Sequence, residues 1–160
     1  MTATRSVPIP DDVAITVVGE RTVTLDADAI ADLPVAETDH LFRCASGRPI
    51  QSEWVGVDAW SLLEAAAVPD DTTHLVVESA DGYRVCIPVG PALDGVVAFT
   101  RDGTPIGDDN PYSSRFVAPG VDGPHAAKGV ARIEALALGP HDDPESLENI
   151  TEDIDGFSAT

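Results

Sequence analysis

The chain has 160 residues, of which 43% are hydrophobic, so it suits one folded domain with a substantial core and argues against global disorder. Its 28 acidic side chains outnumber nine basic ones and give a formal net charge of −19, which disfavours nucleic acid as a partner because a phosphate backbone requires a basic face. Apolar runs stay well below the ~18 residues needed to cross a bilayer, and no signal-peptide core or twin arginine appears. We therefore expect a cytoplasmic protein without a membrane partner.

The acidic residues are spread along the whole chain, and Lys128 is the only lysine. A net charge of this size would ordinarily destabilise a small compact domain by self-repulsion. In molar salt the Debye length falls to roughly 3 Å, and that repulsion is largely screened. The composition therefore predicts a halophilic protein, with an acidic protein that docks a basic partner as the alternative.

The first structured part of the chain is predicted to be a β-hairpin followed by a short helix. Residues 13–18 and 21–25 are rich in β-branched side chains and flank a Gly-Glu pair, which is typical of a hairpin. Asp26 is a candidate N-cap for a helix over residues 27–33, and Pro34 ends that helix.

A strand over residues 40–44 and a turn over residues 45–49 are expected next. Asp58 is a candidate N-cap for a second helix over residues 59–67, which ends before Pro69. Its spacing places one group of side chains on a common face, namely Trp60, Leu63, Ala66 and Ala67.

The second half of the chain is predicted to consist mainly of strands. An Asp-Gly pair joins strands over residues 74–79 and 83–89, and a second Asp-Gly pair follows a strand over residues 96–100. Further strands are expected near Pro105 and over residues 115–118 and 130–138. The pattern predicts an α+β fold of mixed β-sheets with a few short helices.

The ends of the chain are polar. We predict a flexible leader over residues 1–12, a single domain over residues 13–139, and an acidic, disordered tail over residues 140–160 with a short helical turn around Leu147.

Several short motifs follow one another in a recognisable order. Leu33-Pro34 precedes the run His-Leu-Phe-Arg-Cys-Ala-Ser-Gly at residues 40–47, and Trp-Val-Gly-Val at residues 54–57 precedes Leu62-Leu63. Later motifs are Ser-Ala-Asp-Gly-Tyr at 79–83, the apolar strand leading to Asp-Gly-Thr-Pro at 96–105, Pro-x-x-x-Arg-x-x-x-Pro-Gly at 111–120, and Lys-Gly-Val-Ala-Arg-Ile at 128–133.

This order resembles that of the sulfite oxidase family of molybdopterin-binding oxidoreductases. The resemblance covers residues 13 to 138 and implies the sulfite-oxidase fold, a molybdenum cofactor (molybdopterin), and two-electron oxygen-atom transfer on a small oxo-substrate such as an oxyanion. It also implies an electron acceptor of a kind that the sequence does not specify. Two departures are Gly129, where the family usually has tryptophan, and Ala126, where serine is common.

The alternative is a cofactor-free binding or assembly module on the same fold, because a fold does not determine a function. The body of the domain is short for enclosing a large pterin. The sequence also shows no His/Asn-containing segment upstream of Cys44 like the one that supplies pterin contacts in larger members of the family, which favours this alternative.

The resemblance places Cys44 at the position of the molybdenum ligand. A soft thiolate suits a soft, sulfur-rich metal centre, and the neighbouring Arg43 and Arg48 can lower the pKa of a thiol. Arg43 is a second catalytic candidate, because a guanidinium fork can grip phosphate or sulfite oxygens, and its alternative is a salt-bridged surface arginine. Ser46 in the following turn is a candidate cofactor contact. The alternative for Cys44 is a small buried hydrophobe.

Lys128, Arg115 and His125 are the remaining candidate cofactor-binding residues. An ammonium or a guanidinium fork can hold a phosphate or an oxyanion, and backbone amides near Gly129 could face the same anion. The alternatives are an ordinary surface lysine, a salt-bridged surface arginine and a solvated histidine.

The other reactive or aromatic residues are expected to be structural. Cys86, Trp54 and Tyr83 are predicted to be packed, and Trp60 is predicted to pack at the rim of the core. Surface salt bridges are expected for Arg48, Arg101 and Arg132.

Overall fold

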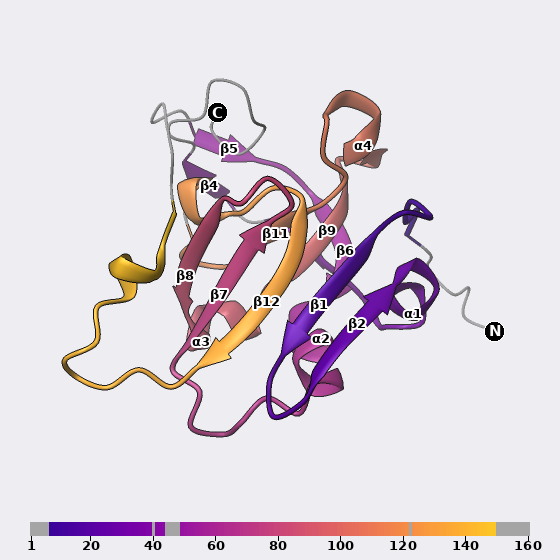
Figure 1. The fold of residues 1–160 in the computed structure, drawn as a ribbon. Coiled ribbons are helices and arrows are strands. Elements are labelled where there is room, and N and C mark those ends of the chain that lie inside the picture. Colours follow the sequence, from indigo (N-terminus) through magenta and orange to yellow (C-terminus); the bar gives the residue numbers. More distant parts are fainter. Residues whose placement is uncertain (1–6, 40, 44–48, 122, 150–160) are drawn as a thin grey trace.

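The structure is a computed structural model. It describes residues 7–39, 41–43, 49–121 and 123–149, with the backbone alone at 41–43, 49, 50 and 124. Two five-stranded sheets form its framework, with short helices at the strand ends (Figure 1).

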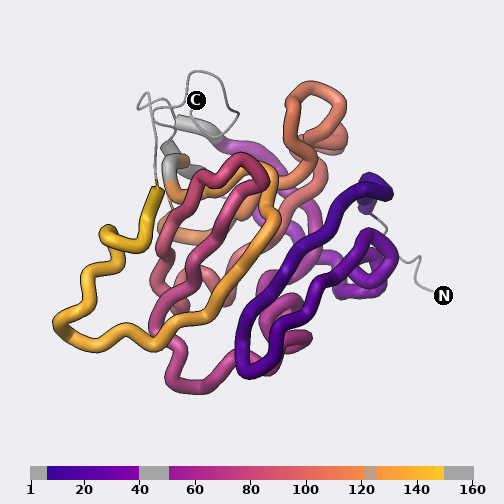
Figure 2. The backbone as a smooth tube through the Cα atoms, viewed as in Figure 1, coloured from indigo at the N-terminus to yellow at the C-terminus, as the bar shows by residue number. Residues whose placement is uncertain are grey.

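The first sheet has the strand order β2-β1-β12-β7-β8. Its strands are β1 (Ala14–Val18), β2 (Thr22–Asp26), β7 (His74–Ser79), β8 (Arg84–Pro88) and β12 (Val130–Leu136). β1 and β12 run parallel and the other neighbours run antiparallel, so the sheet is mixed. The parallel pair places the first strand of the domain beside β12, its last strand, in the interior of the sheet (Figure 2).

The second sheet is antiparallel and carries the candidate site. It contains β3 (Val35–Thr38), β6 (Trp54–Asp58), β9 (Val96–Arg101), β10 (Thr104–Pro105) and β11 (Arg115–Val117). β9 is central, because β6 pairs along its length while β10 and β11 pair with its two halves. A separate two-stranded sheet joins β4 (Leu41–Arg43) to β5 (Pro49–Gln51).

The helices are short. They are α1 (Ala27–Ala31), α2 (Ala59–Ala65), α3 (Val89–Leu93) and α4 (Ile106–Asp109), with the 3₁₀ turns η1 (Gly123–His125) and η2 (Pro144–Leu147). No helix in the described ranges has the length and apolar composition needed to cross a membrane.

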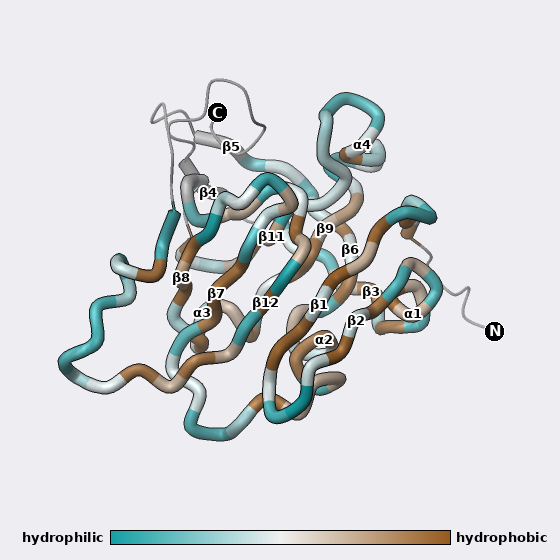
Figure 3. Tube along the Cα trace, in the orientation of Figure 1, coloured by the Kyte–Doolittle hydropathy of each residue, from teal (hydrophilic) through white to brown (hydrophobic). Residues whose placement is uncertain are grey.

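The main core lies between the two sheets and α2. Alternate residues of the strands face inward, such as Ile15 and Val17 of β1 and Leu75 and Val77 of β7, and Leu62 of α2 packs among them. Figure 3 shows the same division, with hydrophobic residues along these strands and hydrophilic residues at the β1–β2 turn. A smaller cluster contains Trp54, Val96, Ala98, Ile106 and Val117, and it lies beneath the candidate site.

The predicted hairpins and their turns are confirmed. Asp102 and Gly103 adopt φ values of +50° and +83° between β9 and β10, and Gly82 adopts +92° between β7 and β8. At Asp102-Gly103 both central residues have positive φ, which is the geometry that twists with the flanking strands and is favoured by Asp-Gly pairs.

The first helix is capped as predicted. The Asp26 carboxylate accepts a hydrogen bond of 2.9 Å from the Ala29 amide. Removal of such a cap destabilises a protein by about 1 kcal/mol. Asp26→Ala is therefore expected to lower the free energy of unfolding by about that amount in a urea titration, whereas Glu20→Ala, in the exposed hairpin turn, should change it by less than about 0.5 kcal/mol.

The second helix corrects two predictions. Asp58 occupies the N-cap position, but its carboxylate accepts from the Ser61 hydroxyl at 3.3 Å and makes no cap bond to a backbone amide. Trp60 does not share the buried face, since it is 47% exposed while Leu63 and Ala66 are buried. The buried face runs instead through Ala59 and its neighbours, because the helix rests on β6 and β1 rather than on the rim of the core.

Six elements were not predicted as such, namely β3, β5, β6, α3, α4 and η1. The two helices have only five and four residues and no side-chain cap bond, so they carry no helical periodicity to detect. β6 is buried on both faces and therefore lacks the alternation of a half-exposed strand.

The polar ends of the chain contact the domain more than expected. Val7 and Ile9, within the predicted leader, pack against the main core. Residues 140–149, assigned above to a disordered tail, include the expected turn at Leu147 as η2 and lie against β8. Residues 150–160 are outside the described part.

Candidate functional site

Arg115 and Lys128 are brought together by backbone pairing. Arg115 opens β11, which pairs with β9 in the register Arg115 to Ala98, and Arg115 also forms an isolated β-bridge with Lys128. Hydrogen bonds on either side close this bridge, from the Phe116 amide to Ala127 O at 2.9 Å and from the Gly129 amide to Ser114 O at 2.7 Å. The last loop of the fold is thereby laid against the edge of the second sheet.

The Arg115 side chain is buried and held in a fixed orientation. It is 4% exposed, and its Nε and Nη2 atoms donate to the carbonyl oxygens of Ala126 and Gly123 at 3.0 and 3.2 Å. Burial removes water from a guanidinium that remains charged at all ordinary pH values. Such a group interacts more strongly with an anion than an exposed arginine does.

Lys128 is also inside the protein. It is 2% exposed, and its Nζ atom lies 5.6 Å from the centre of the Tyr112 ring, which is cation–π distance. The alternatives of a surface lysine and a salt-bridged surface arginine are therefore wrong for Lys128 and Arg115 respectively.

The Trp54 ring contacts two guanidinium groups. Its ring centre is 5.2 Å from Arg101 Cζ and 5.9 Å from Arg115 Cζ. The pairing of β6 with β9 sets Trp54 directly opposite Arg101, whose Nε donates to the Ser52 hydroxyl at 2.8 Å. The tryptophan face thus helps to hold two cations near one another.

Most of these groups line one cavity of about 410 Å³, although Lys128 is not among the described residues of its wall. Trp54, Arg101, Tyr112 and Arg115 are on its wall, together with Asp102 and Asp109. The volume is at the lower end of the range of small-molecule and cofactor sites. Its wall therefore carries two guanidinium groups and two carboxylates, and Arg115 is the buried cation among them.

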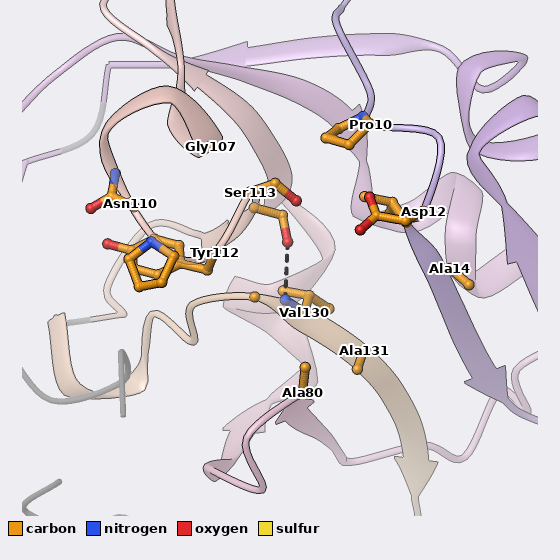
Figure 4. Close-up of a pocket in the computed structure, with 14 residues that line it drawn as sticks. Pro10, Asp12, Ala14, Ala80, Gly107, Asn110, Tyr112, Ser113, Val130 and Ala131 are labelled. Carbon is orange, nitrogen blue, oxygen red and sulfur yellow. Dashed lines mark hydrogen bonds between the residues drawn. The ribbon is translucent and has the colours of Figure 1, made fainter. Parts of the chain in front are cut away.

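A second cavity of about 380 Å³ adjoins the first, since both include Asn110 and Tyr112 (Figure 4). Pro10 and Asp12 face it from one side and β12 from the other, and the hydrogen bond from the Val130 amide to Ser114 Oγ crosses its floor. The described residues on its wall include a carboxylate but no arginine or lysine. It is less suited to an anion than the cavity beside Trp54.

Burial raises the pKa of the Tyr112 phenol, and Arg115 and Arg101 oppose that rise. A phenol with a raised pKa stays neutral at physiological pH and keeps a proton that it can donate. Tyr112 is therefore a hydrogen-bond donor at the junction of the two cavities.

The other predicted site residues are placed differently. His125 is absent from the described wall of the Arg115 cavity, and its Nε2 lies 2.8 Å from the Glu148 carboxylate. The Gly129 and Val130 amides are already bonded to Ser114, so the prediction that amides near Gly129 face an anion is wrong for these two. Cys44, Ser46 and Arg48 lie outside the described residues, and for Arg43 the structure gives only the backbone, in β4.

Three contributors were not singled out from the sequence as site residues: Arg101, Trp54 and Tyr112. Arg101 was expected to make a surface salt bridge, but it bonds to Ser52 and lines the cavity. A usable signal was its position at the end of a strand before an Asp-Gly turn, where a side chain can face a pocket. The salt-bridge prediction is confirmed for Arg132, which pairs with Glu134 at 3.3 Å, and Cys86 and Tyr83 are buried as predicted.

The sequence comparison matches residues 4–139 to the model of one family, the oxidoreductase molybdopterin binding domain. The chain belongs to this family.

Two sulfite oxidases are among the relatives of this molybdopterin-binding domain. The mitochondrial sulfite oxidase of Drosophila melanogaster is 27% identical over 145 residues, which cover 72% of this chain and 25% of that protein. The sulfite oxidase of Gallus gallus is 26% identical over an alignment of 173 residues, which covers 88% of this chain and 37% of that protein. The chain thus spans between a quarter and two fifths of the length of these relatives.

A solved structure confirms the fold. The sulfane dehydrogenase SoxCD from Paracoccus pantotrophus superposes with a TM-score of 0.72 at 20% identity, over 86% of this chain and 41% of that one. The predicted class, mixed β-sheets with a few short helices in a sulfite-oxidase-like molybdopterin-binding fold, is therefore correct.

Proposed function

We propose that this domain is a molybdenum-dependent oxidoreductase of the sulfite-oxidase type, which carries out two-electron oxygen-atom transfer on a small oxo-substrate. The observation that supports the proposal is the clustering of three of the few basic residues. Of the nine in a chain with a net charge of −19, Arg101, Arg115 and Lys128 gather around Trp54 and Tyr112.

Two of these cations, Arg115 and Lys128, are almost completely buried, and burial strengthens the interaction of a charge with an anion that reaches it. A cavity whose wall includes Arg101 and Arg115 suits an anionic ligand such as the phosphate of a pterin cofactor or an oxyanion substrate. The donor set therefore fits the anionic part of the cofactor that characterises the family.

Each candidate residue has a proposed role. Arg115 and Lys128 hold the anionic group, and Tyr112 and Trp54 keep the two cations in place. Cys44 supplies the thiolate that ligates molybdenum, with Arg43 and Ser46 as its neighbours at the cofactor. We assign His125 to the support of the site, because it pairs with Glu148.

When bound, the cofactor supplies the redox chemistry, and the protein orients and shields it. The hydrogen bonds from Arg115 to two carbonyl oxygens fix the direction from which its guanidinium meets an anion. The burial of both cations keeps water away and strengthens their interaction with that anion.

The ligand role of Cys44 can be tested with the two cysteines of the chain. Protein purified in high KCl from a molybdenum-replete host is expected to contain close to one molybdenum per chain and a visible thiolate-to-metal band. Cys44→Ala is expected to lose both, because the metal then lacks its protein thiolate. Metal analysis and the absorption spectrum are the measurements.

Cys86→Ala is the matched control, because it removes the other thiol, which is buried within β8 and is absent from the described wall of the Arg115 cavity. It is expected to keep the metal and the band. A colourless wild-type protein that cannot be reconstituted with the cofactor would contradict the proposal and favour a cofactor-free binding or assembly module.

A further inference from the structure

The C-terminal segment 140–149 returns to the exposed edge of the first sheet. After β12 the chain turns back through η2 and runs beside β8, as the yellow end of the described chain shows (Figures 1 and 2). Asn149 and Arg84 exchange two backbone hydrogen bonds of 2.8 and 3.2 Å, and the Asn149 side chain donates to Gly82 O at 3.1 Å. These bonds cover an edge strand that would otherwise offer unpaired backbone groups.

Glu148 connects this segment to two other parts of the fold. Its Oε2 atom accepts a 3.0 Å hydrogen bond from the Cys86 amide of β8 and lies 2.8 Å from Nε2 of His125 in η1. The Glu148 side chain is only 11% exposed, although most acidic residues of this chain face solvent. One carboxylate therefore joins β8, η1 and the C-terminal segment.

η1 is also the element that holds Arg115. The two carbonyl oxygens that accept from the Arg115 guanidinium belong to Gly123 and Ala126, and His125 lies between these residues along the chain. The turn is closed by the Ala126 amide, which donates to Gly123 O at 3.1 Å. A contact that fixes His125 therefore also restricts the two acceptors of Arg115.

We propose that residues 140–149 form a clip that positions the Arg115 guanidinium, and that Glu148 is its positioning residue. The path runs from Glu148 to His125, through the η1 backbone, to the Gly123 and Ala126 carbonyls and Arg115. The inference deepens the proposed function, because it makes the geometry of the anion site depend on an acidic segment outside the cavity. Lys128 lies three residues after His125, the last residue of η1, and belongs to the same loop.

The proposed clip explains why the residue at position 148 is acidic. A carboxylate accepts from a backbone amide and an imidazole with the same oxygen, and charged acceptors form the stronger hydrogen bonds. An alanine at position 148 leaves the Cys86 amide and His125 without this acceptor, so η1 is expected to move more freely.

The first test reads the position of Arg115 without any ligand. In ¹⁵N-labelled protein, we expect the Arg115 Nε–H group to be protected from exchange with water, because it donates to Ala126 O. Glu148→Ala is expected to raise the exchange rate of this proton about fivefold or more, since substitutions along a contact network change coupling by a comparable factor. Glu148→Gln, which retains an acceptor oxygen, is expected to recover part of the protection.

Glu145→Ala is the matched control. It removes the same charge from η2, but Glu145 is exposed. The Arg115 exchange rate should stay at its wild-type value. An unchanged rate in Glu148→Ala, in protein whose circular dichroism shows it to be folded, would overturn the inference. If Glu148→Ala does not fold, Glu148→Gln decides, because an exchange rate identical to that of wild type contradicts the clip.

The second test measures inorganic phosphate binding by calorimetry in high KCl. Glu148→Ala is expected to weaken the binding about threefold to tenfold, and Glu145→Ala to leave it unchanged. If Glu148→Ala lowers the free energy of unfolding but binds phosphate as tightly as wild type, Glu148 has only a structural role and the inference is contradicted. If wild-type protein does not bind phosphate, the proposed anion site fails, while the Arg115 exchange rate still decides the clip.

Discussion

Gly56→Ala is expected to destabilise the domain by about 4 kcal/mol or more, or to prevent its folding altogether. A Cβ atom on Gly56 would lie 1.9 Å from Val97 O and 2.6 Å from the Ala98 Cα. Both obstacles are backbone atoms of β9, so no side-chain rotation can relieve the clash. β6 and β9 would have to separate at the register shift between Val55 and Gly56, where β9 carries an extra residue, Phe99, between the partners Ala98 and Thr100.

The same change is expected to reach the candidate site. The pairing of β6 with β9 sets Trp54 opposite Arg101, and this register brings the Trp54 ring to the two guanidinium groups. Any chains of Gly56→Ala that do fold should therefore bind phosphate more weakly than wild type, by calorimetry.

Gly90→Ala is the control for this substitution. Gly90 lies in α3, has no atom within 4 Å of the position of a Cβ, and does not have a positive φ. Alanine there is expected to stabilise the protein by about 0.5–1 kcal/mol, because it restricts the unfolded chain and favours the helix. Urea titrations at constant KCl measure both variants. A loss below about 1 kcal/mol for Gly56→Ala would show that β6 and β9 can move apart.

Arg115→Gln is expected to weaken phosphate binding at least about tenfold and to lower the free energy of unfolding by about 2–4 kcal/mol. The substitution removes the charge that faces the cavity and the fork that bonds to Gly123 O and Ala126 O. Arg115→Lys is expected to retain part of the affinity but not the stability, because an ammonium cannot reproduce the planar fork.

Arg132→Gln removes the same charge from an exposed position. The Arg132 side chain is 43% exposed and pairs with Glu134 on the surface of the first sheet. Its stability should change by less than about 0.5 kcal/mol and its phosphate affinity should be unchanged. Equal losses of affinity in the two variants would mean that net charge, rather than the buried fork, controls anion binding.

Local signals in the sequence predicted the parts of the fold that depend on neighbouring residues. The Asp102-Gly103 turn and the Asp26 cap are decided within four residues, so their sequence patterns were sufficient. α4 could not be predicted in this way, because so short a helix forms only where the surrounding chain packs it through Ile106.

The residues of the candidate site also fall into two groups, those selected from the sequence and those that only tertiary contacts bring to the site. Arg115 and Lys128 were selected through the resemblance to the sulfite oxidase family, and the structure pairs them in a β-bridge. Arg101 and Tyr112 were not selected, because their approach to Trp54 and Lys128 depends on strand register and on a loop returning to the sheet.

The sequence by itself determined the family, the mixed-sheet class, the main hairpins and the acidic character of the chain. Tertiary structure alone decided that Arg115 and Lys128 are buried. It also decided that Glu148, unlike most acidic residues of the chain, is largely shielded from solvent and bonds to the Cys86 amide and His125. The physical reason is that turns and caps satisfy hydrogen bonds between near neighbours, whereas burial and sheet-edge pairing join residues far apart in the chain. Their partners are therefore known only once the sheets have assembled.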